Sequence, residues 1–370
     1  MEGTVGKSSA DTPRSKNAVQ SFLTRYRVCL LLIGATLILN IVARLSPAAA
    51  DLIGGTVGAA FRFLLSFLTS PFPFPLAEVL TVILPIAVLL LAIFGIRRVV
   101  SGGDTGAFTF FIIVLVTLLY PLYFFTLGVG YRITPGYVSL GLDPDEVGYE
   151  DAEAFTVYLS GEINSLSCGI QRSENGSTAS GMSADELSDE LCRIWGCGST
   201  RIKPLVPEAL FTSAGINGMY FPFTGEVCVN FSYPDYTVVF SAAHEFAHRC
   251  GISREEEANF EAYRRLMNGG TPYLRYSAAL SMYEIVLGDM SRADPELYRT
   301  AWERLSEGAK SDILAARDHA SEHAGKVTDA SDALNDAALK FNGGGGRASY
   351  GEAAAIAIAH YKKYIAVSGR

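Results

Sequence analysis

The chain has 370 residues, of which 49% are hydrophobic, and its mean hydropathy is positive at +0.24. This composition predicts a membrane region joined to a soluble domain. The formal net charge of −8 is unevenly divided, because residues 1–131 carry 9 basic and 5 acidic side chains, whereas residues 132–370 carry 21 and 33. Such an acidic second part argues against nucleic acid or an anionic lipid surface as its partner.

The first 131 residues are expected to form a disordered cytoplasmic tail and a membrane region. Residues 1–20 are polar and serine-rich without an apolar period, which is typical of disorder. Three apolar stretches in residues 21–131 approach the roughly 20 residues needed to cross a bilayer. The predicted transmembrane helices lie at about 28–48, 77–97 and 106–130. Residues 63–77 are aromatic but broken by three prolines, so an interfacial or re-entrant segment is expected there.

Basic residues indicate the orientation in the membrane. They precede the first span and follow the second, as Lys7, Arg14, Lys16, Arg25, Arg27, Arg97 and Arg98. By the positive-inside rule the N-terminus and the second loop are cytoplasmic, so three crossings place residues 132–370 outside the cytoplasm. The first span could instead be a cleaved signal peptide, because residues 46–50 resemble a small-residue cleavage site. Cleavage would leave two spans and the same external domain of a multi-pass cell-membrane protein.

The external domain, residues 132–370, is predicted to be mainly helical with a small β element. Helical spacing or alanine-rich amphipathic patterns occur in four segments, 184–195, 298–316, 330–341 and 350–367. The best strand candidate is 226–231, where Val227, Val229 and Phe231 alternate with polar or small residues. This strand is expected at the sheet edge, where it could pair with an extended peptide.

The sequence His-Glu-Phe-Ala-His occupies residues 244–248 and uses two of the five histidines in the chain. On a helix, positions i and i+4 lie on one face, so His244 and His248 can direct both imidazoles at one metal ion. Glu245 then stands beside the metal, where its carboxylate can accept a proton from water. HExxH is the signature of zinc peptidases, which indicates a Zn²⁺ site.

A third ligand is expected from the acidic run that follows this helix. Ser253 is a candidate N-cap for a second helix, and catalytic zinc usually has three protein ligands. Either Glu255 or Glu257 could reach back across the turn at Gly251. Asn259, one helical turn after Glu255, is a candidate for holding a ligand in place.

Two resemblances concern this region. The segment from Glu255 to Asn259 is similar to the Glu-x-x-Ala-Asp/Asn segment of several gluzincin peptidases, which implies that Glu255 is the zinc ligand. The spacing differs, because those families separate the two motifs by far more residues, and Glu257 therefore stays an alternative. The wider pattern resembles an uncharacterised bacterial membrane family, domain of unknown function 3810. The shared features are the N-terminal spans, 223–226, 244–251, 255–260, 276–278 and 349–351.

These features predict a membrane-anchored, zincin-like metallopeptidase acting on a peptide or protein substrate. Glu245 is expected to serve as general base and then to return the proton to the leaving amine. Tyr273, Tyr276 and Tyr350 are candidate donors to the developing oxyanion, and Tyr276 is also a candidate support for the zinc ligands. The alternative is a polytopic membrane sensor or assembly protein in which zinc is structural and no bond is cleaved.

Overall fold

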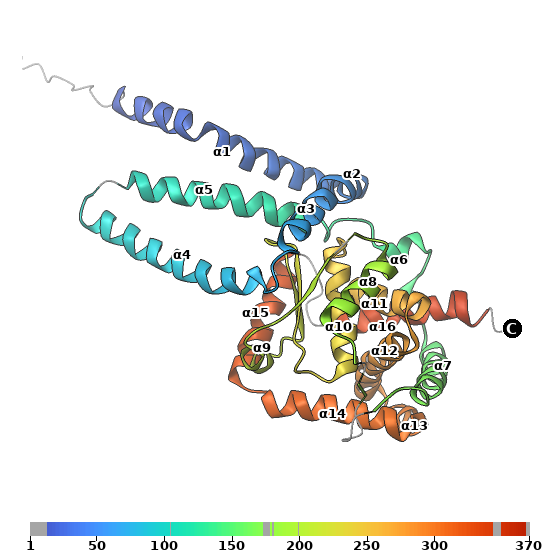
Figure 1. Ribbon diagram of the computed structural model, residues 1–370. Helices are drawn as coiled ribbons and strands as arrows, with labels where there is room; N and C mark the ends of the chain where they lie inside the picture. The colour runs from blue at the N-terminus through green and yellow to red at the C-terminus, as the bar shows by residue number, and fades with distance from the viewer. Residues whose placement is uncertain are drawn as a thin grey trace, which may run out of the picture.

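The computed structural model describes residues 13–103, 105–172, 178–179, 181–198, 200–342 and 349–367. Helices dominate this part of the chain and the strands form one small sheet, which confirms the prediction of a mainly α protein with a small β element. Figure 1 shows long apolar helices extending from a rounded group of shorter helices packed around the sheet.

Among the described residues four stretches are long and apolar enough to cross a membrane, one more than the three that were predicted. They are Gln20–Leu45, Pro47–Thr69, Leu76–Val100 and Gly106–Gly128. The additional stretch, Pro47–Thr69, takes in the first half of the 63–77 segment, because no proline interrupts its helix before Pro71. A helix begins at Pro13, within the range predicted for the tail, and residues 1–12 lie outside the described residues.

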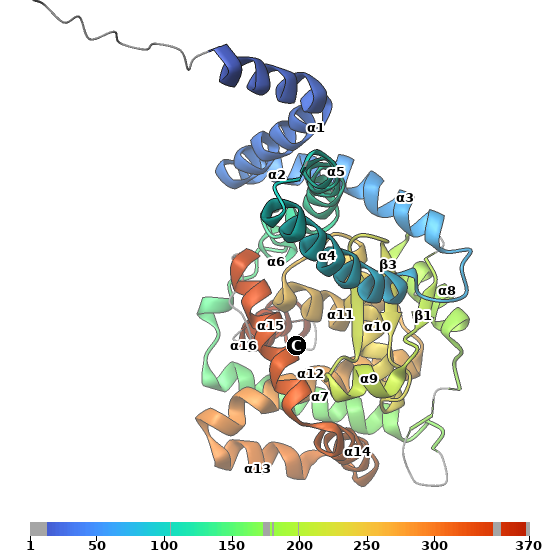
Figure 2. The same cartoon turned by 90° about the vertical axis from the view of Figure 1, so that its left-hand side faces the viewer.

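The apolar elements differ in how they are arranged. Three long helices, α1 (Pro13–Leu45), α4 (Leu76–Val100) and α5 (Gly106–Tyr123), run side by side, and α5 continues as the π-helical turn η2 (Phe124–Gly128). The start of α1 and the α4–α5 connection lie at the end far from the sheet (Figures 1 and 2). The fourth stretch, comprising α2, η1 and α3, instead crosses the end of this group that adjoins the sheet. Its elements are α2 (Pro47–Ile53), η1 (Gly54–Gly58) and α3 (Ala59–Thr69).

Most of the remaining helices contribute to one hydrophobic core around α10 and α12. The helix predicted at 184–195 is confirmed as α8, whereas the segment 298–316 contains two helices, α13 and α14, because Ser306 caps a new helix. The elements are α6 (Gly136–Ser139), η3 (Pro144–Glu146), α7 (Tyr149–Ser167), α8 (Ala184–Trp195), α9 (Glu208–Ser213), α10 (Asp235–Arg249), α11 (Glu255–Gly269), α12 (Pro272–Ala293), α13 (Pro295–Arg304), α14 (Glu307–His323), α15 (Lys326–Asn342), α16 (Ser349–His360) and η5 (Tyr361–Ile365).

The sheet has the strand order β1–β3–β2, with β1 (Ile202–Pro204), β2 (Gly218–Phe221) and β3 (Glu226–Val229). β1 pairs with β3 in parallel, and β2 pairs with β3 antiparallel. The predicted strand is therefore confirmed at 226–229, but its expected position is wrong. β3 is central and fully buried, and the edge that lies next to the HExxH helix is β2.

A buried ion pair joins this sheet to the long apolar helices. The Lys203 ammonium lies 2.5 Å from the Glu226 carboxylate, and both side chains are only 1% exposed. The Glu226 carboxylate also accepts from the backbone N–H groups of Leu76 (3.0 Å) and Ala77 (2.6 Å), the first residues of α4. The negative charge thus caps the N-terminus of the apolar helix α4, where unpaired N–H groups favour an anion.

Candidate metal centre

The helix α10 carries the HExxH motif in its last two turns. It begins at Asp235 after Pro234, and its apolar side chains are buried against β2, β3, α11 and α12. The chain leaves the helix through Gly251, whose φ of +104° is accessible to glycine but strained for other residues. This burial keeps the two motif histidines on a rigid element, as a metal site requires.

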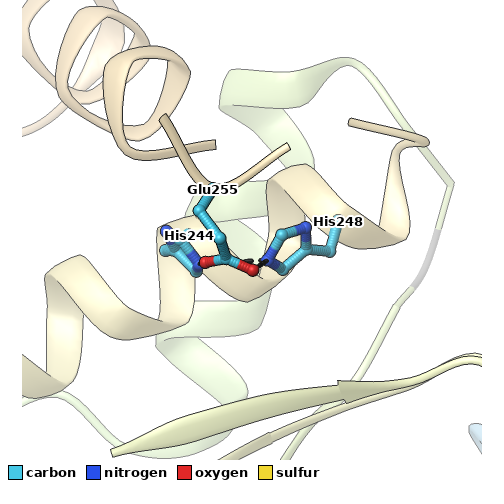
Figure 3. A group of neighbouring side chains, drawn as sticks. All are labelled: His244, His248 and Glu255. Atoms are coloured by element: carbon cyan, nitrogen blue, oxygen red, sulfur yellow. Dashed lines mark hydrogen bonds and ion pairs between the residues drawn. The ribbon is translucent and has the colours of Figure 1, made fainter. Parts of the chain in front are cut away.

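Three side chains converge at the end of α10, and we call His244, His248 and Glu255 the metal cluster. The Nε2 atoms of the two histidines lie 3.0 Å apart. The Glu255 carboxylate lies between the rings, with its oxygens 3.1 Å from His244 Nε2 and 3.5 Å from His248 Nε2 (Figure 3). Ligands about 2.0–2.1 Å from a tetrahedral zinc are separated by roughly 3.4 Å, so these distances suit that ion.

Hydrogen bonds set the protonation of both rings in a way that favours a cation. His244 Nδ1 lies 2.9 Å from Asn259 Oδ1, and His248 Nδ1 lies 2.7 Å from the Ile252 carbonyl oxygen. Both partner oxygens are acceptors, so each neutral ring carries its proton on Nδ1 and directs the Nε2 lone pair into the cluster. Two lone pairs and a carboxylate then face one another, which is a stable arrangement only with positive charge between them.

The charges within the metal cluster also favour a cation at this position. Burial alone would raise the pKa of Glu255, but the adjacent His248 and His244 outweigh it and hold that pKa well below its usual range. Burial would lower the pKa of His248, yet the Glu255 carboxylate raises it to about 9. The pocket therefore stabilises positive charge beside the carboxylate.

Glu245 lies between the metal cluster and the edge strand β2. Burial raises the pKa of Glu245, while His244 and His248 lower it. The backbone amide of Tyr220 in β2 donates to its carboxylate. A Cβ at Gly218 would come within 2.9 Å of Glu245 Cγ, so a glycine is needed where the strand passes this side chain.

The structure brings some of the predicted residues together and not others. Asn259 contacts His244 as expected, whereas the Glu257 carboxylate accepts from the backbone N–H of Gly136 and faces away from the cluster. Ser253 is not the N-cap, because α11 begins at Glu255 after Arg254.

The predicted tyrosines do not join the cluster. Tyr276 donates to Asp312 at 2.5 Å, and the Tyr273 hydroxyl donates to Asp235 at 3.1 Å. The side chain of Tyr350 lies outside the described residues.

Tyr131 is a further candidate for a site residue, and the sequence patterns did not single it out. It follows the last apolar helix by three residues, and its carbonyl accepts from Arg254 Nη2 at 3.1 Å, directly before the ligand Glu255. Burial raises the pKa of its phenol, and the neighbouring Glu255 and Glu256 carboxylates raise it further. Its phenol therefore keeps its proton and can donate it in a hydrogen bond. Because Tyr131 lies more than 100 residues before the motif, no local pattern connects the two.

Comparisons with known proteins give one match. No curated protein and no solved structure matches this chain. A family model described as "Protein of unknown function (DUF3810)" matches residues 58–358, from the end of η1 to α16, and this range contains the whole metal cluster. The match extends over most of the 370 residues, and the chain therefore belongs to the DUF3810 family.

Proposed function

We propose that this chain is a membrane-anchored zinc metallopeptidase of the zincin type, in which His244, His248 and Glu255 hold the metal. The observation that carries the proposal is that their three ligand atoms lie within 4.8 Å of one another on adjoining helices. This places an HExxH motif and a third, carboxylate ligand together, the ligand set of two histidines and one glutamate found in catalytic zinc sites.

The number of ligands favours catalysis over a purely structural metal. Structural zinc sites are closed by four protein ligands, whereas catalytic sites keep one position for water or substrate. Among the described residues, the His, Cys, Asp and Glu side chains that converge here number three. The rival proposal, a sensor or assembly protein with a structural zinc, predicts a fourth protein ligand.

Each residue near the cluster has a role that follows from its position. Bound zinc would supply a Lewis acid and lower the pKa of a water molecule to near 7. Glu245 accepts the proton of that water and passes it to the leaving amine. β2 is the edge strand of the sheet and lies beside Glu245, and in this proposal its backbone groups bind an extended peptide. Tyr131 donates a hydrogen bond to the oxygen on which charge develops.

For the topology, we propose that α1, α4 and α5 with η2 cross the bilayer, while α2, η1 and α3 lie along its outer surface. The basic residues Arg25, Arg27, Arg97 and Arg98 belong to the end of this group far from the metal cluster, which supports a cytoplasmic location for that end (Figure 1). Arg62, a positive charge on the external side, is buried, and its guanidinium donates to the Gly54 carbonyl at 3.0 Å. The metal cluster then lies outside the cytoplasm.

The test is the substitution Glu245→Gln in full-length protein reconstituted in vesicles with Zn²⁺. Loss of the general base should lower hydrolysis of a randomised, internally quenched peptide library by about 10²–10⁴-fold. Zinc content, measured by plasma mass spectrometry, should stay at the wild-type value because Glu245 is not a ligand. Glu307→Gln makes the same chemical change at a side chain that is 91% exposed, and it should hydrolyse the library like the wild type.

Two outcomes would contradict the proposal. Full hydrolysis by Glu245→Gln would remove Glu245 as the general base. A wild-type protein that binds zinc but cleaves no member of the library would instead favour the structural-zinc alternative.

A further inference from the structure

We infer that the substrate of this site is a membrane-anchored protein, cleaved in an extended segment close to the bilayer surface. This inference rests on the proposed peptidase function. It depends on where the metal cluster lies relative to the ends of the membrane helices, and on a helix whose apolar face points away from the protein.

The helix that carries Glu255 begins against the end of the last membrane helix. The Ser253 hydroxyl donates to the Leu127 carbonyl at 2.8 Å, within η2. The approach is so close that a Cβ at Gly130 would lie 2.1 Å from the Ser253 hydroxyl oxygen and 2.7 Å from the Gly251 carbonyl. Only Arg254 separates Ser253 from the ligand Glu255, so the metal cluster lies about one helical turn from the boundary of the span.

The helix α3 has its polar face buried and its apolar face exposed, the reverse of a helix on a soluble protein. Arg62, Ser66 and Thr69 are buried, and the Thr69 hydroxyl donates to the Thr224 carbonyl at 3.2 Å in the turn between β2 and β3. On the opposite face, four large apolar side chains are each 52–58% exposed. They are Phe63, Leu64, Phe67 and Leu68.

Lipid is the occupant that this apolar face fits. The chain runs into α3 from α1 through α2 and η1 and leaves it toward α4, so α3 adjoins the membrane helices (Figure 2). Many large apolar side chains of those helices are also exposed. Amphipathic helices like α3 lie in the plane of the interface with their apolar side in the acyl region. In this proposal α3 binds lipid through apolar side chains. Such binding needs no basic residues, which is consistent with the acidic charge of the external domain.

The substrate strand is thereby held close to the bilayer. The turn that joins β2 to β3 packs on α3, where a Cβ at Gly225 would lie 2.9 Å from the Ser66 nitrogen. A peptide that pairs with β2 therefore passes beside α3 and continues toward the lipid. A protein whose extended segment begins at a membrane anchor reaches this position directly, since each extended residue advances about 3.3 Å.

The first experiment measures the position of α3 and does not require activity. The variant Phe67→Trp of the full chain is placed in phosphatidylcholine vesicles whose lipids are brominated near the headgroup. Its added fluorescence should be quenched at least twofold more strongly than that of Leu314→Trp, which places tryptophan on an exposed apolar position of α14, the helix drawn far from the membrane helices in Figure 1. Equal quenching in the two variants would overturn the docking of α3.

The second experiment compares cleavage of one randomised, internally quenched decapeptide library in three forms. The library is free, coupled directly to a phosphatidylethanolamine headgroup, or coupled through a spacer of about 30 Gly and Ser residues. Both coupled forms are concentrated at the membrane, but the long spacer lets the peptide reach roughly 30 Å from its anchor. At equal surface density the directly coupled form should be cleaved at least tenfold faster than the spacer form.

The outcomes separate this inference from the proposed function. Equal cleavage of the two coupled forms, with Glu245→Gln inactive, would overturn the substrate class and leave the peptidase function standing. Quenching of Phe67→Trp without cleavage of any form would overturn both the peptidase function and the substrate class. The substitution Phe67→Glu should lower the ratio of directly coupled to free cleavage by at least fivefold, while Leu314→Glu should leave that ratio unchanged.

Discussion

The protein contains two buried groups of charged side chains, and they differ in how completely their atoms are satisfied. In the first, which we call the sheet network, Lys203 and Glu226 are surrounded by protein partners. The Lys203 ammonium donates to the Thr69 and Phe74 carbonyls as well as to Glu226. The Glu226 carboxylate accepts from the Thr224 hydroxyl and from two backbone amides. Positive and negative charge balance within the network, so it needs no further ligand.

In the metal cluster, by contrast, the charged and polar atoms lack a complete set of protein partners. Its two imidazoles use their Nδ1 protons on Asn259 and Ile252, and their Nε2 atoms meet at 3.0 Å beside a carboxylate. In the described part of the chain no ammonium or guanidinium forms an ion pair with Glu255, whose partners are the two histidines. Burial of charge thus marks both regions, but only a shortage of internal partners points to a ligand.

Removal of a carboxylate should lower the zinc content of the protein only if that carboxylate belongs to the metal cluster. The variant Glu255→Gln is expected to lower zinc from about one ion per chain to near zero after dialysis, because a neutral amide replaces an anionic ligand. Plasma mass spectrometry measures the metal content. Glu257→Gln is the control two residues away and should retain zinc, and loss of zinc in that variant alone would reassign the third ligand.

In the sheet network, removal of one charged partner should destabilise the protein without affecting zinc binding. Lys203→Met leaves the Glu226 carboxylate buried without its cation, which costs about 3–5 kcal/mol in the free energy of unfolding. Denaturant unfolding in detergent micelles measures the loss. The double variant Lys203→Met/Glu226→Gln keeps an acceptor for the α4 amides and should recover part of the stability. A single variant as stable as wild type would show that the ion pair is dispensable.

The role proposed for Tyr131 can be tested by removing its hydroxyl. Tyr131→Phe removes a hydrogen-bond donor near Glu255 and should lower kcat about 100-fold while zinc content and KM change little. Peptide hydrolysis by the zinc-loaded protein gives both constants. A fall in zinc content equal to the fall in activity would mean that Tyr131 supports the metal ligands instead of the reaction.

The smallest effect is expected when a hydrogen-bond partner of a proposed metal ligand is removed. Asn259→Ala removes the acceptor of the His244 Nδ1 proton and should weaken zinc binding by about 10–100-fold. Competition with a zinc-binding dye measures the affinity. Tyr276→Phe is the matched control, because Tyr276 contacts Asp312 and not the metal cluster, and it should leave zinc affinity at the wild-type value.

The residues of the metal cluster were predictable where the relevant geometry is local. His244 and His248 lie one helical turn apart, and helix geometry alone places them on one face. The choice between Glu255 and Glu257 was not predictable from spacing, because both follow the same turn. It depends on the start of α11 at Glu255 and on Gly136, which supplies a donor to Glu257 from a segment 121 residues away.

Non-local pairing explains the parts of the fold that the sequence did not reveal. β1 and β2 have three and four residues, too few to display alternation, so β3 could not be recognised as central. Lys203 and Glu226 are 23 residues apart and meet only when β1 pairs with β3. The helix α3 was missed for a different reason, since the aromatic side chains of 63–77 and its prolines suggested one interrupted segment, whereas the prolines follow the helix.

The contact between Glu226 and the first amides of α4 has a consequence for how this protein can be produced and studied. A secreted fragment that starts after the last span would lack Leu76 and Ala77, and its central strand would keep a carboxylate with two of its donors missing. Such a fragment is expected to fold poorly, so purification should retain the bilayer-embedded portion. If α4 and α5 cross the bilayer as proposed, their insertion is expected to come before the sheet can close, and membrane integration would then be a prerequisite for assembling the domain that holds the metal cluster.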